Sequence, residues 1–507
     1  MQLKTKEITY KNEEFIIKKF KYDLQFFPYY NARFNAMAGR ILLCRDICCA
    51  PLLFNTALLC LESVRKQATI SWPTTPIHDM SDLATNEEDE EEDEHMKNGG
   101  SSQGSDSKRS HIDLEILNGK VVVVLGTLFK KMPNQPNILK EVDAEKKLLS
   151  LKHADEEVTN FVSKEDRMYL QAGNETMELK GEELKMDKLC TGICVAVKGH
   201  INQHGSGFIV EDICHVAIDE VERPLKPVDY YVVIASGLGF SMDMAKNDLL
   251  SSSLNLLFEL LVGNSILSKD KQITNFIIAG NCIGKNARDE EKDANEEDKL
   301  TPLWNKKVQS FTVDAVKLLD KFLCTVGQFL SVDIMPGVLD PCNTLWPQQP
   351  MHPCLFPNAY RLDSVLSVTN PHRASYFGVE FFGTSGQNVD TLRSCTALSE
   401  STEIMRHLME WGHIAPTCPD TLPCYPYSTK DPFVLTSYPD IFFAGNQPEF
   451  SATSFETPAG KKVQLLAVPA FEDSRIVAMV NLRTLKCEMM AFNWSCQLIN
   501  LLNYTWV

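Results

Sequence analysis

Four short turns occupy the positions at which this 507-residue chain would place catalytic side chains. Each turn follows a short apolar segment that we expect to form a buried strand. Ligands of layered α/β domains usually bind beyond the carboxyl ends of such strands. Carboxylates and imidazoles at these places would predict metal-assisted hydrolysis, because two metal ions need such ligands to activate a water. The turns read Ser236-Gly237-Leu238-Gly239, Gly280-Asn281-Cys282-Ile283-Gly284, Pro336-Gly337-Val338-Leu339-Asp340 and Gly445-Asn446-Gln447-Pro448.

These turns carry almost no side chain that could coordinate a metal. Glycine, valine, leucine and proline offer no donor atom, and Asp340 is the one carboxylate among them. Asp340 together with His352 or His413 would leave a two-metal site several ligands short. We therefore predict that these three residues are hydrogen-bonded structural groups and that the chain has no hydrolase activity.

Sixteen cysteines raise a second metal chemistry, which their spacing does not support. The closest pairs are Cys44 with Cys48, the adjacent Cys48 and Cys49, and Cys190 with Cys194. No Cys-x-x-Cys pair of the zinc-ribbon or iron-sulfur type occurs. Since the N-terminus does not read as a secretory signal, we interpret the cysteines as reduced thiols that mostly fill the core.

The second half of the chain alternates between strand and helix patterns. Short β-branched runs at 231–235, 276–280 and 332–335 are typical of buried central strands. Apolar residues recur three or four positions apart between 313 and 323, which predicts a helix. This pattern predicts an α/β domain over 226–486. We expect the later strands to extend the same layer, at 366–369, 379–383, 440–444, 463–467 and 475–481.

The first half has a different organisation. Strand-like runs at 120–129, 190–200 and 208–218, with a Gly-rich turn between the last two, predict a small OB-fold barrel over 111–225. We also expect an aromatic and helical segment at 1–66, a disordered acidic insert at 67–110 and an atypical tail at 487–507.

The charge of the chain limits its partners. The formal net charge is -17, and the acidic run at 87–94 supplies part of it. Proteins that bind nucleic acid through phosphates normally present a basic face, so tight autonomous DNA binding is not expected. Apolar stretches at 41–61 and 489–507 are interrupted by charged or polar residues, and we predict that neither spans a membrane.

The four turns resemble the metal-binding motifs of calcineurin-like phosphoesterases with their ligands replaced. The Asp-x-His motif of those enzymes falls on Gly237 and Gly239, and their second Asp-x-x-Asp motif falls on Asn281 and Gly284. The Asn-His pair of the third motif falls on Val338 and Leu339, while its acidic position keeps Asp340. The two late histidines fall on Asn446 and Pro448. The resemblance implies a two-sheet phosphoesterase fold without its metal ligands.

Longer phrases resemble the small (B) subunits of DNA polymerase delta, and together they cover most of residues 118–486. They are found at 125–132, 336–341, 347–350, 352–357, 369–371, 383–389, 415–422 and 424–426. The resemblance implies a nuclear, non-catalytic scaffold without a cofactor of its own. It also implies binding to the C-terminal domain of the catalytic subunit and to the third accessory subunit, an indirect link to the sliding clamp, and at most weak or indirect DNA contact.

Two other functions stay open at this point. One is an active metal-dependent nuclease or phosphoesterase subunit, against which the four turns argue. The other is a single-strand DNA-binding OB module, which would need exposed aromatic side chains beside Lys or Arg. Lys130 and Lys131 offer a small basic spot for such a module, but the other strands are apolar or acidic, as at Glu211 and Asp212.

Overall fold

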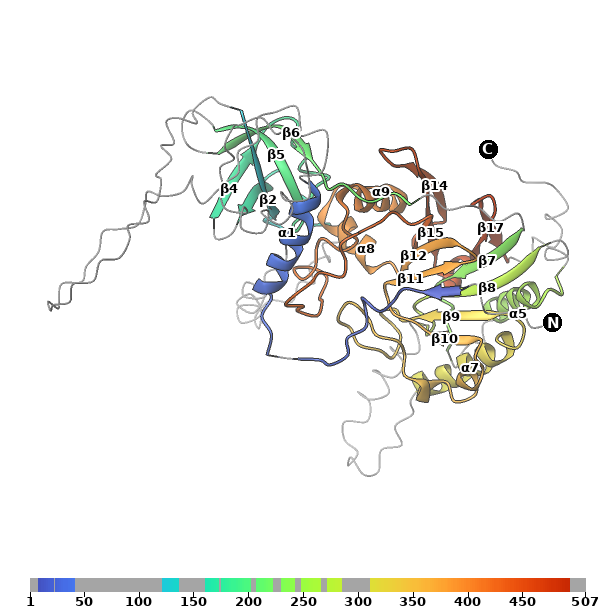
Figure 1. The fold of residues 1–507 in the computed structure, drawn as a ribbon. Coiled ribbons are helices and arrows are strands. Elements are labelled where there is room, and N and C mark those ends of the chain that lie inside the picture. The colour runs from blue at the N-terminus through green and yellow to red at the C-terminus, as the bar shows by residue number, and fades with distance from the viewer. Residues whose placement is uncertain are drawn as a thin grey trace, which may run out of the picture. The chain divides into compact units, whose positions relative to one another are not determined.

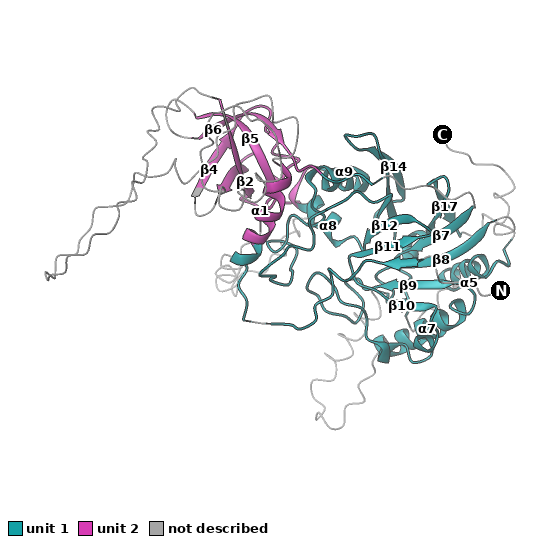
Figure 2. Cartoon of the chain, viewed as in Figure 1, with its two compact units in different colours: residues 1–29, 218–394, 398–507 teal, residues 30–217, 395–397 magenta. Residues whose placement is uncertain are grey.

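The protein folds into two compact units, which we describe separately (Figure 1). The computed structural model describes residues 8–21, 23–41, 121–135, 160–172, 175–201, 207–221, 229–241, 248–265, 271–284 and 311–492. Figure 2 shows the α/β unit, formed by Met1–Tyr29, Ile218–Ser394 and Leu398–Val507, and the barrel unit, formed by Tyr30–Ala217 and Cys395–Ala397. The predicted acidic insert at 67–110 lies outside the described residues.

The barrel unit is a closed five-stranded barrel with the strand order β2-β3-β4-β6-β5. The predicted first strand and the predicted hairpin are confirmed as β2 and as the antiparallel pair β5 and β6. The sequence did not predict β3 and β4, because their outward positions are charged or polar and break up the apolar pattern. The strands are β2 (Val122–Lys131), β3 (Arg167–Ala172), β4 (Glu175–Lys180), β5 (Cys194–Ile201) and β6 (Phe208–Cys214).

The helix α1 (Phe27–Ile41) contributes to the same unit from Tyr30 onward. Its Arg33 is fully buried and donates a hydrogen bond to the carbonyl of Gly192, 3.3 Å away. Met37 is also fully buried. A buried guanidinium needs such acceptors to offset its desolvation, so α1 is an integral part of the barrel core.

The first sheet of the α/β unit has the order β10-β9-β8-β7-β16-β17. Strands β7 to β10 are parallel neighbours, and β16 and β17 are antiparallel additions. Helices α5 (Asp248–Val262) and α7 (Phe311–Val326) bury their apolar sides against one face of this sheet. The strands are β7 (Tyr230–Ala235), β8 (Gln272–Ala279), β9 (Ser331–Met335), β10 (Val365–Ser367), β16 (Ile476–Asn481) and β17 (Cys487–Ala491).

A second sheet packs on the opposite face of the first. Its order is β1-β11-β12-β13-β15-β14, and a shared apolar core lies between the sheets. Helices α8 (Gln387–Cys395) and α9 (Ser401–Trp411) belong to the same half of the chain, and α9 contacts β14 and β15. The strands are β1 (Ile8–Tyr10), β11 (His372–Tyr376), β12 (Val379–Thr384), β13 (Ile441–Gln447), β14 (Ser451–Glu456) and β15 (Lys462–Pro469).

The expectation of one continuous layer is therefore wrong. Strands β10 and β16 do join the first sheet, whereas β12, β13 and β15 form the parallel centre of the second. All six residues of β12 are buried, because core lies on both sides of it. A strand covered on both faces has the same apolar sequence in either sheet, so its composition does not reveal its layer.

The two ends of the described chain are edge strands rather than separate segments. Strand β1 pairs with β11, so the first described residues of the predicted 1–66 segment belong to the α/β unit. Strand β17 pairs with β16, and the sheet thus continues past the boundary expected at residue 486. Within the described ranges, no helix is long and apolar enough to cross a membrane.

Candidate functional site

The four turns singled out from the sequence meet at one end of the α/β unit. Strands β7, β8 and β9 run parallel side by side, so their carboxyl ends lie at the same edge. The backbone N–H of Gly237 donates a hydrogen bond to the carbonyl of Gly280 at 2.9 Å. The backbone N–H of Asn446 donates one to Oγ of Ser236 at 2.8 Å. The end of β13, which holds Asn446, is therefore bonded to the turn after β7, and the two sheets meet at this place.

The first motif position is closed by neighbouring atoms. Gly237 and Gly239 have φ angles of 57° and 71°, a left-handed conformation that favours glycine. A Cβ atom at Gly237 would lie 2.6 Å from the Cβ of Ala470, and one at Gly239 would lie 2.7 Å from side-chain atoms of Glu472. At Gly284 an added Cβ would approach Oε1 of Glu472 to 3.2 Å. The segment at 470–472 therefore fills the space beside these three glycines.

Asp340 binds backbone amides instead of a cation. Its side chain is 1% exposed, and its two oxygens accept hydrogen bonds from the amides of Ile283, at 3.2 Å, and Gly337, at 2.8 Å. Burial raises the pKa of Asp340 to about 6, while these backbone hydrogen bonds act in the opposite direction. Asn281 completes the link, because its Oδ1 accepts from the amide of Leu339 at 3.0 Å. The turns after β8 and β9 are thus tied together by polar side chains.

Asn446 forms a second bridge, between the turns of both sheets. Its Nδ2 donates to the carbonyls of Ala279, at 3.1 Å, and Ser385, at 2.9 Å. Asn446 has a φ of 55°, a conformation that asparagine tolerates better than most residues. The other late position, Pro448, is exposed. The side chain of Asn446 therefore ties backbone carbonyls of both sheets together.

Val338 and Leu339 lie at the outer side of the same end. Val338 is 55% exposed, and Leu339 is half-buried. The nine sequence-predicted positions belong to one region of the α/β unit, where an added Cβ at Gly237 would lie 2.9 Å from Oδ1 of Asn446.

A cluster of amide and hydroxyl side chains lies beside these turns, and sequence reasoning missed it. Asn370 is fully buried, and the two hydrogens of its Nδ2 are shared among oxygens of Gln348, Ser385 and Gln387, which lie 2.8 to 3.0 Å away. Gln348 in turn donates to the carbonyl of Gly337 at 3.1 Å. These residues fall inside the phrases that carry the family resemblance, at 347–350, 369–371 and 383–389. The family resemblance was therefore the one signal in the sequence that could have pointed to this cluster, because Asn and Gln residues have no characteristic spacing in a sequence.

The two histidines considered beside Asp340 have other roles. His352 is exposed, and its Nδ1 accepts the amide of Cys354 at the start of a short 3-10 helix (Pro353–Leu355). His413 is buried, with Nε2 2.9 Å from Oδ2 of Asp431. The structural role predicted for both is consistent with these contacts. Among the described residues, no three His, Cys, Asp or Glu side chains are grouped closely enough to hold a metal ion.

Comparison with known proteins identifies the family. DNA polymerase delta subunit 2 of Drosophila melanogaster is 34% identical over 374 residues, which cover 73% of this chain and 83% of the relative. The DNA polymerase delta small subunit of Arabidopsis thaliana is 33% identical over 381 residues, covering 74% and 82%. That of Saccharomyces cerevisiae is 27% identical over 413 residues, covering 74% and 80%. The chain belongs to the small-subunit family of DNA polymerase delta.

Two protein-family models match the two halves of this polymerase delta small-subunit chain. The one described as DNA polymerase delta subunit OB-fold domain matches residues 60–213, which include the closed barrel, so the predicted OB-fold is confirmed. The one that describes the B subunits of DNA polymerases alpha and epsilon matches residues 232–452, which include the four turns. Membership of this family makes the chain an accessory subunit of polymerase delta in DNA replication.

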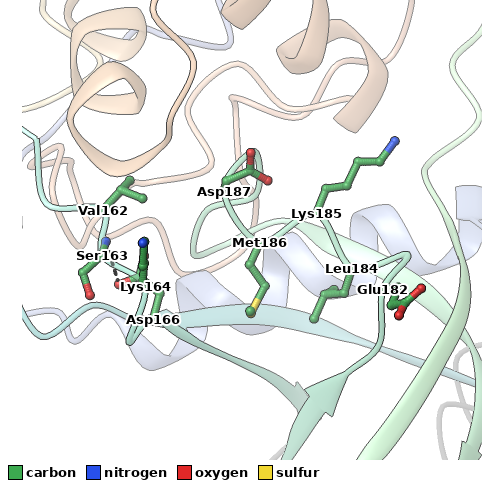
Figure 3. Close-up of a pocket in the computed structure, with 9 residues that line it drawn as sticks. All are labelled: Val162, Ser163, Lys164, Asp166, Glu182, Leu184, Lys185, Met186 and Asp187. Carbon is green, nitrogen blue, oxygen red and sulfur yellow. Dashed lines mark hydrogen bonds between the residues drawn. The ribbon is translucent and has the colours of Figure 1, made fainter.

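The barrel unit of this small-subunit chain carries two neighbouring hollows. One, of about 560 Å³, opens between residues 162–166 and 182–187, where Lys164 and Lys185 alternate with acidic side chains (Figure 3). The other, of about 580 Å³, shares Lys164 and Asp166 with the first and is also lined by Lys131 and Arg167. The second hollow thus has the more basic lining.

Proposed function

We propose that this chain is a non-catalytic scaffold subunit of polymerase delta, built on a calcineurin-like phosphoesterase domain that has lost its metal site. The observation that carries this proposal is the closed first motif. The space beside Gly239 is occupied by Glu472, whose side-chain atoms lie 2.7 Å from the position of an added Cβ. Real Cβ atoms do not make contacts that short, so an aspartate or histidine does not fit there without displacing the 470–472 segment.

The hydrogen bonds of the remaining polar side chains support the same proposal. A catalytic carboxylate must offer its oxygens to metal ions. Those of Asp340 accept backbone amides and are shielded from solvent, at 1% exposure. Asn446 likewise uses its Nδ2 hydrogens on two carbonyls. These groups stabilise the turns, and the function that follows is support of other subunits rather than hydrolysis.

As its direct partner we propose the C-terminal domain of the catalytic subunit, with the third accessory subunit held next to it. Through them the chain would be linked to the sliding clamp in the nucleus. The proline-rich segment 346–357 supports a docking role, because Trp346, Met351 and Phe356 anchor it in the core. Anchored loops lose little conformational entropy when a partner binds.

Co-expression with the C-terminal domain of the delta catalytic subunit tests this proposal. We expect affinity capture and size-exclusion chromatography to recover a stoichiometric complex. Separate elution of the two folded proteins would overturn the partner assignment.

A nuclease assay tests the loss of the metal site independently. The purified chain should not hydrolyse single-stranded DNA or a generic phosphodiester in the presence of manganese. If it did, and if an Asp340→Ala variant were inactive, the chain would be an active phosphoesterase subunit.

A further inference from the structure

The outward face of strands β2 and β3 carries a pair of aromatic rings. Phe129 lies directly opposite Tyr169 in the antiparallel register, and their ring centroids are 6.3 Å apart. Phe129 is 43% exposed and Tyr169 is half-buried, whereas their neighbours Leu128 and Met168 are fully buried. Side chains alternate between the two faces of a strand, so the two rings lie on the solvent side of the barrel.

Basic side chains continue this face. Lys131 and Arg167 form the next outward pair of the same register, and both are exposed. Lys130, which the sequence had joined with Lys131 in a basic spot, is only 1% exposed. Its Nζ lies 3.4 Å from Oδ2 of Asp166, so it neutralises a buried carboxylate inside the barrel. The exposed basic pair on this face is therefore Lys131 with Arg167 of the neighbouring strand, and not the predicted Lys130 with Lys131.

The acidic side chains on this face do not block it. Glu178 on β4 pairs with Lys180 at 2.8 Å and makes a longer contact of 3.9 Å with Arg167. Ion pairs as exposed as these are weak, so a phosphate can compete for both cations. Within the described residues, Lys131 forms no ion pair. It borders the 580 Å³ hollow, which Lys164 and Arg167 also line together with Glu165 and Asp166. Three basic side chains thus face two acidic ones, and Asp166 is already paired with Lys130.

We propose that this surface, which we name the aromatic-basic face and define by Phe129, Lys131, Arg167 and Tyr169, binds single-stranded DNA. Rings that stack on bases and cations that follow the phosphates are the combination used for strand binding without sequence preference. OB barrels of other proteins bind oligonucleotides on the face of their second and third strands, here β3 and β4, and at adjoining loops. The aromatic-basic face shares β3 with that region and extends to the neighbouring strand β2. A polymerase copies a single-stranded template, so the ligand is present where the complex works.

The net charge of -17 should weaken DNA binding, but it does not prevent binding at the aromatic-basic face. The repulsion acts over the whole chain and is screened within roughly 10 Å at ordinary salt, whereas the four side chains contact the strand directly. We therefore expect weak, salt-dependent binding with a dissociation constant in the range of about 1 to 100 μM. This inference does not depend on the scaffold role, because capture of the catalytic subunit and binding of an oligonucleotide are measured separately.

Fluorescence anisotropy of a labelled oligothymidylate with the full chain is the first measurement. Phe129→Ala and Tyr169→Ala should each weaken binding at least about fivefold, the lower limit for loss of one stacked base. Phe129→Leu keeps an apolar side chain on the strand and should weaken binding as well, which separates stacking from folding. Lys131→Gln should lower the slope of log K against log salt by about 0.7.

Matched controls come from the α/β unit. Tyr360 is 64% exposed and Lys462 is exposed, so Tyr360→Ala and Lys462→Gln remove the same kinds of group at places outside the proposed face. Both variants should keep the wild-type affinity. Equal losses in the controls and in the face variants would overturn the assignment of the site.

Photocrosslinking within the assembled polymerase complex gives a second, independent readout. An oligothymidylate with 5-iodouracil substitutions should crosslink to the peptide that holds Phe129 or to the one that holds Tyr169, as identified by mass spectrometry. The proposal fails if the full chain binds the oligonucleotide more weakly than about 100 μM or if crosslinks form elsewhere only. It also fails if Phe129→Ala leaves oligonucleotide binding unchanged and abolishes capture of the catalytic subunit, since the face would then be a protein interface.

Discussion

The His372 ring donates a hydrogen bond from Nε2 to Oη of Tyr376, across 2.9 Å. The direction is fixed because the single hydroxyl hydrogen of Tyr376 is given to Oδ2 of Asp333, 2.5 Å away. Nδ1 of His372 must then accept from Asn12, at 3.0 Å, while Tyr10 donates to the other oxygen of Asp333 at 2.8 Å. A buried relay thus joins the N-terminal segment to both sheets of the α/β unit.

The relay makes stability depend on pH through His372. Burial lowers the pKa of His372 to about 3, so the native state binds fewer protons than the unfolded state between about pH 3 and 6.5. Its contribution is fully present above about pH 6.5 and is lost as the pH falls. Between about pH 7.5 and pH 6.0, His372→Gln should lose about 1 kcal/mol less unfolding free energy than the wild type, as measured with urea.

Asp333 provides the control because its shift has the opposite sign. Burial raises the pKa of Asp333 to about 6, so its contribution is present below about pH 4 and is lost as the pH rises through 6. Asp333→Asn should therefore lose slightly more stability than the wild type over the same acidification, by about half a kcal/mol. Movement of both variants in the same direction would contradict the opposite pH dependences of His372 and Asp333 in the relay.

Tyr10 fixes the edge strand β1 through the same carboxylate. Removal of its hydroxyl in Tyr10→Phe leaves one oxygen of Asp333, which is fully buried, without that donor. We expect a loss of about 1.5 to 3 kcal/mol, the range for hydrogen bonds to charged groups. Urea unfolding measures it, and Tyr360→Phe, at a 64% exposed position, should stay within about 0.5 kcal/mol of the wild type. Equal stability of both variants would mean that β1 is held by backbone pairing alone.

The sequence predicted the central strands of the α/β unit well and its edges poorly. Central strands such as β8 and β12 are buried on both faces and read as continuous apolar runs. Edge strands such as β1 and β14 are short or largely exposed, and their formation depends on partners distant in the chain. Tertiary pairing, rather than local pattern, decides these elements.

The candidate site divides in a similar way. The four turns could be located because each ends a recognisable strand, and the lack of metal donors follows from residue types alone. What the sequence could not reveal is which distant side chains pack against these turns. Glu472 and Ala470 come from a segment after β15, and Asn370 reaches Ser385 only because the second sheet places them together. Such contacts carry no local signature.

We expect Asp340 to stabilise the fold through the backbone amides that it binds. Asp340→Ala leaves the buried amides of Ile283 and Gly337 without their carboxylate acceptor, which should cost about 2 to 4 kcal/mol. Hydrogen exchange at these two amides should accelerate more than exchange in the strands around them. Asp314→Ala, at an exposed ion pair with Lys317, is the control and should change stability by less than about 1 kcal/mol. Unchanged amide protection in Asp340→Ala would show that other groups hold the turn.

Substitution of Gly239 tests whether the space beside the first turn is closed by packing. Gly239→Ala carries two costs, a left-handed φ of 71° and a contact of 2.7 Å with Glu472. Gly378→Ala carries the first cost alone, because its φ is 89° and an added Cβ would meet nothing within 4 Å. We expect about 1 kcal/mol for the control and about 2 to 4 kcal/mol for Gly239→Ala.

A second substitution places a side chain that could bind a metal ion at the same position. Gly239→His should unfold at lower urea than Gly239→Ala, because the larger side chain must displace the 470–472 segment. Manganese should not restore its stability, since a bound metal stabilises only a native state that can hold it. A manganese-dependent rise in the melting temperature of Gly239→His would show that the segment yields and that the site retains room for an ion. In that case the loss of ligands, and not the packing of Glu472, would be the barrier to metal binding.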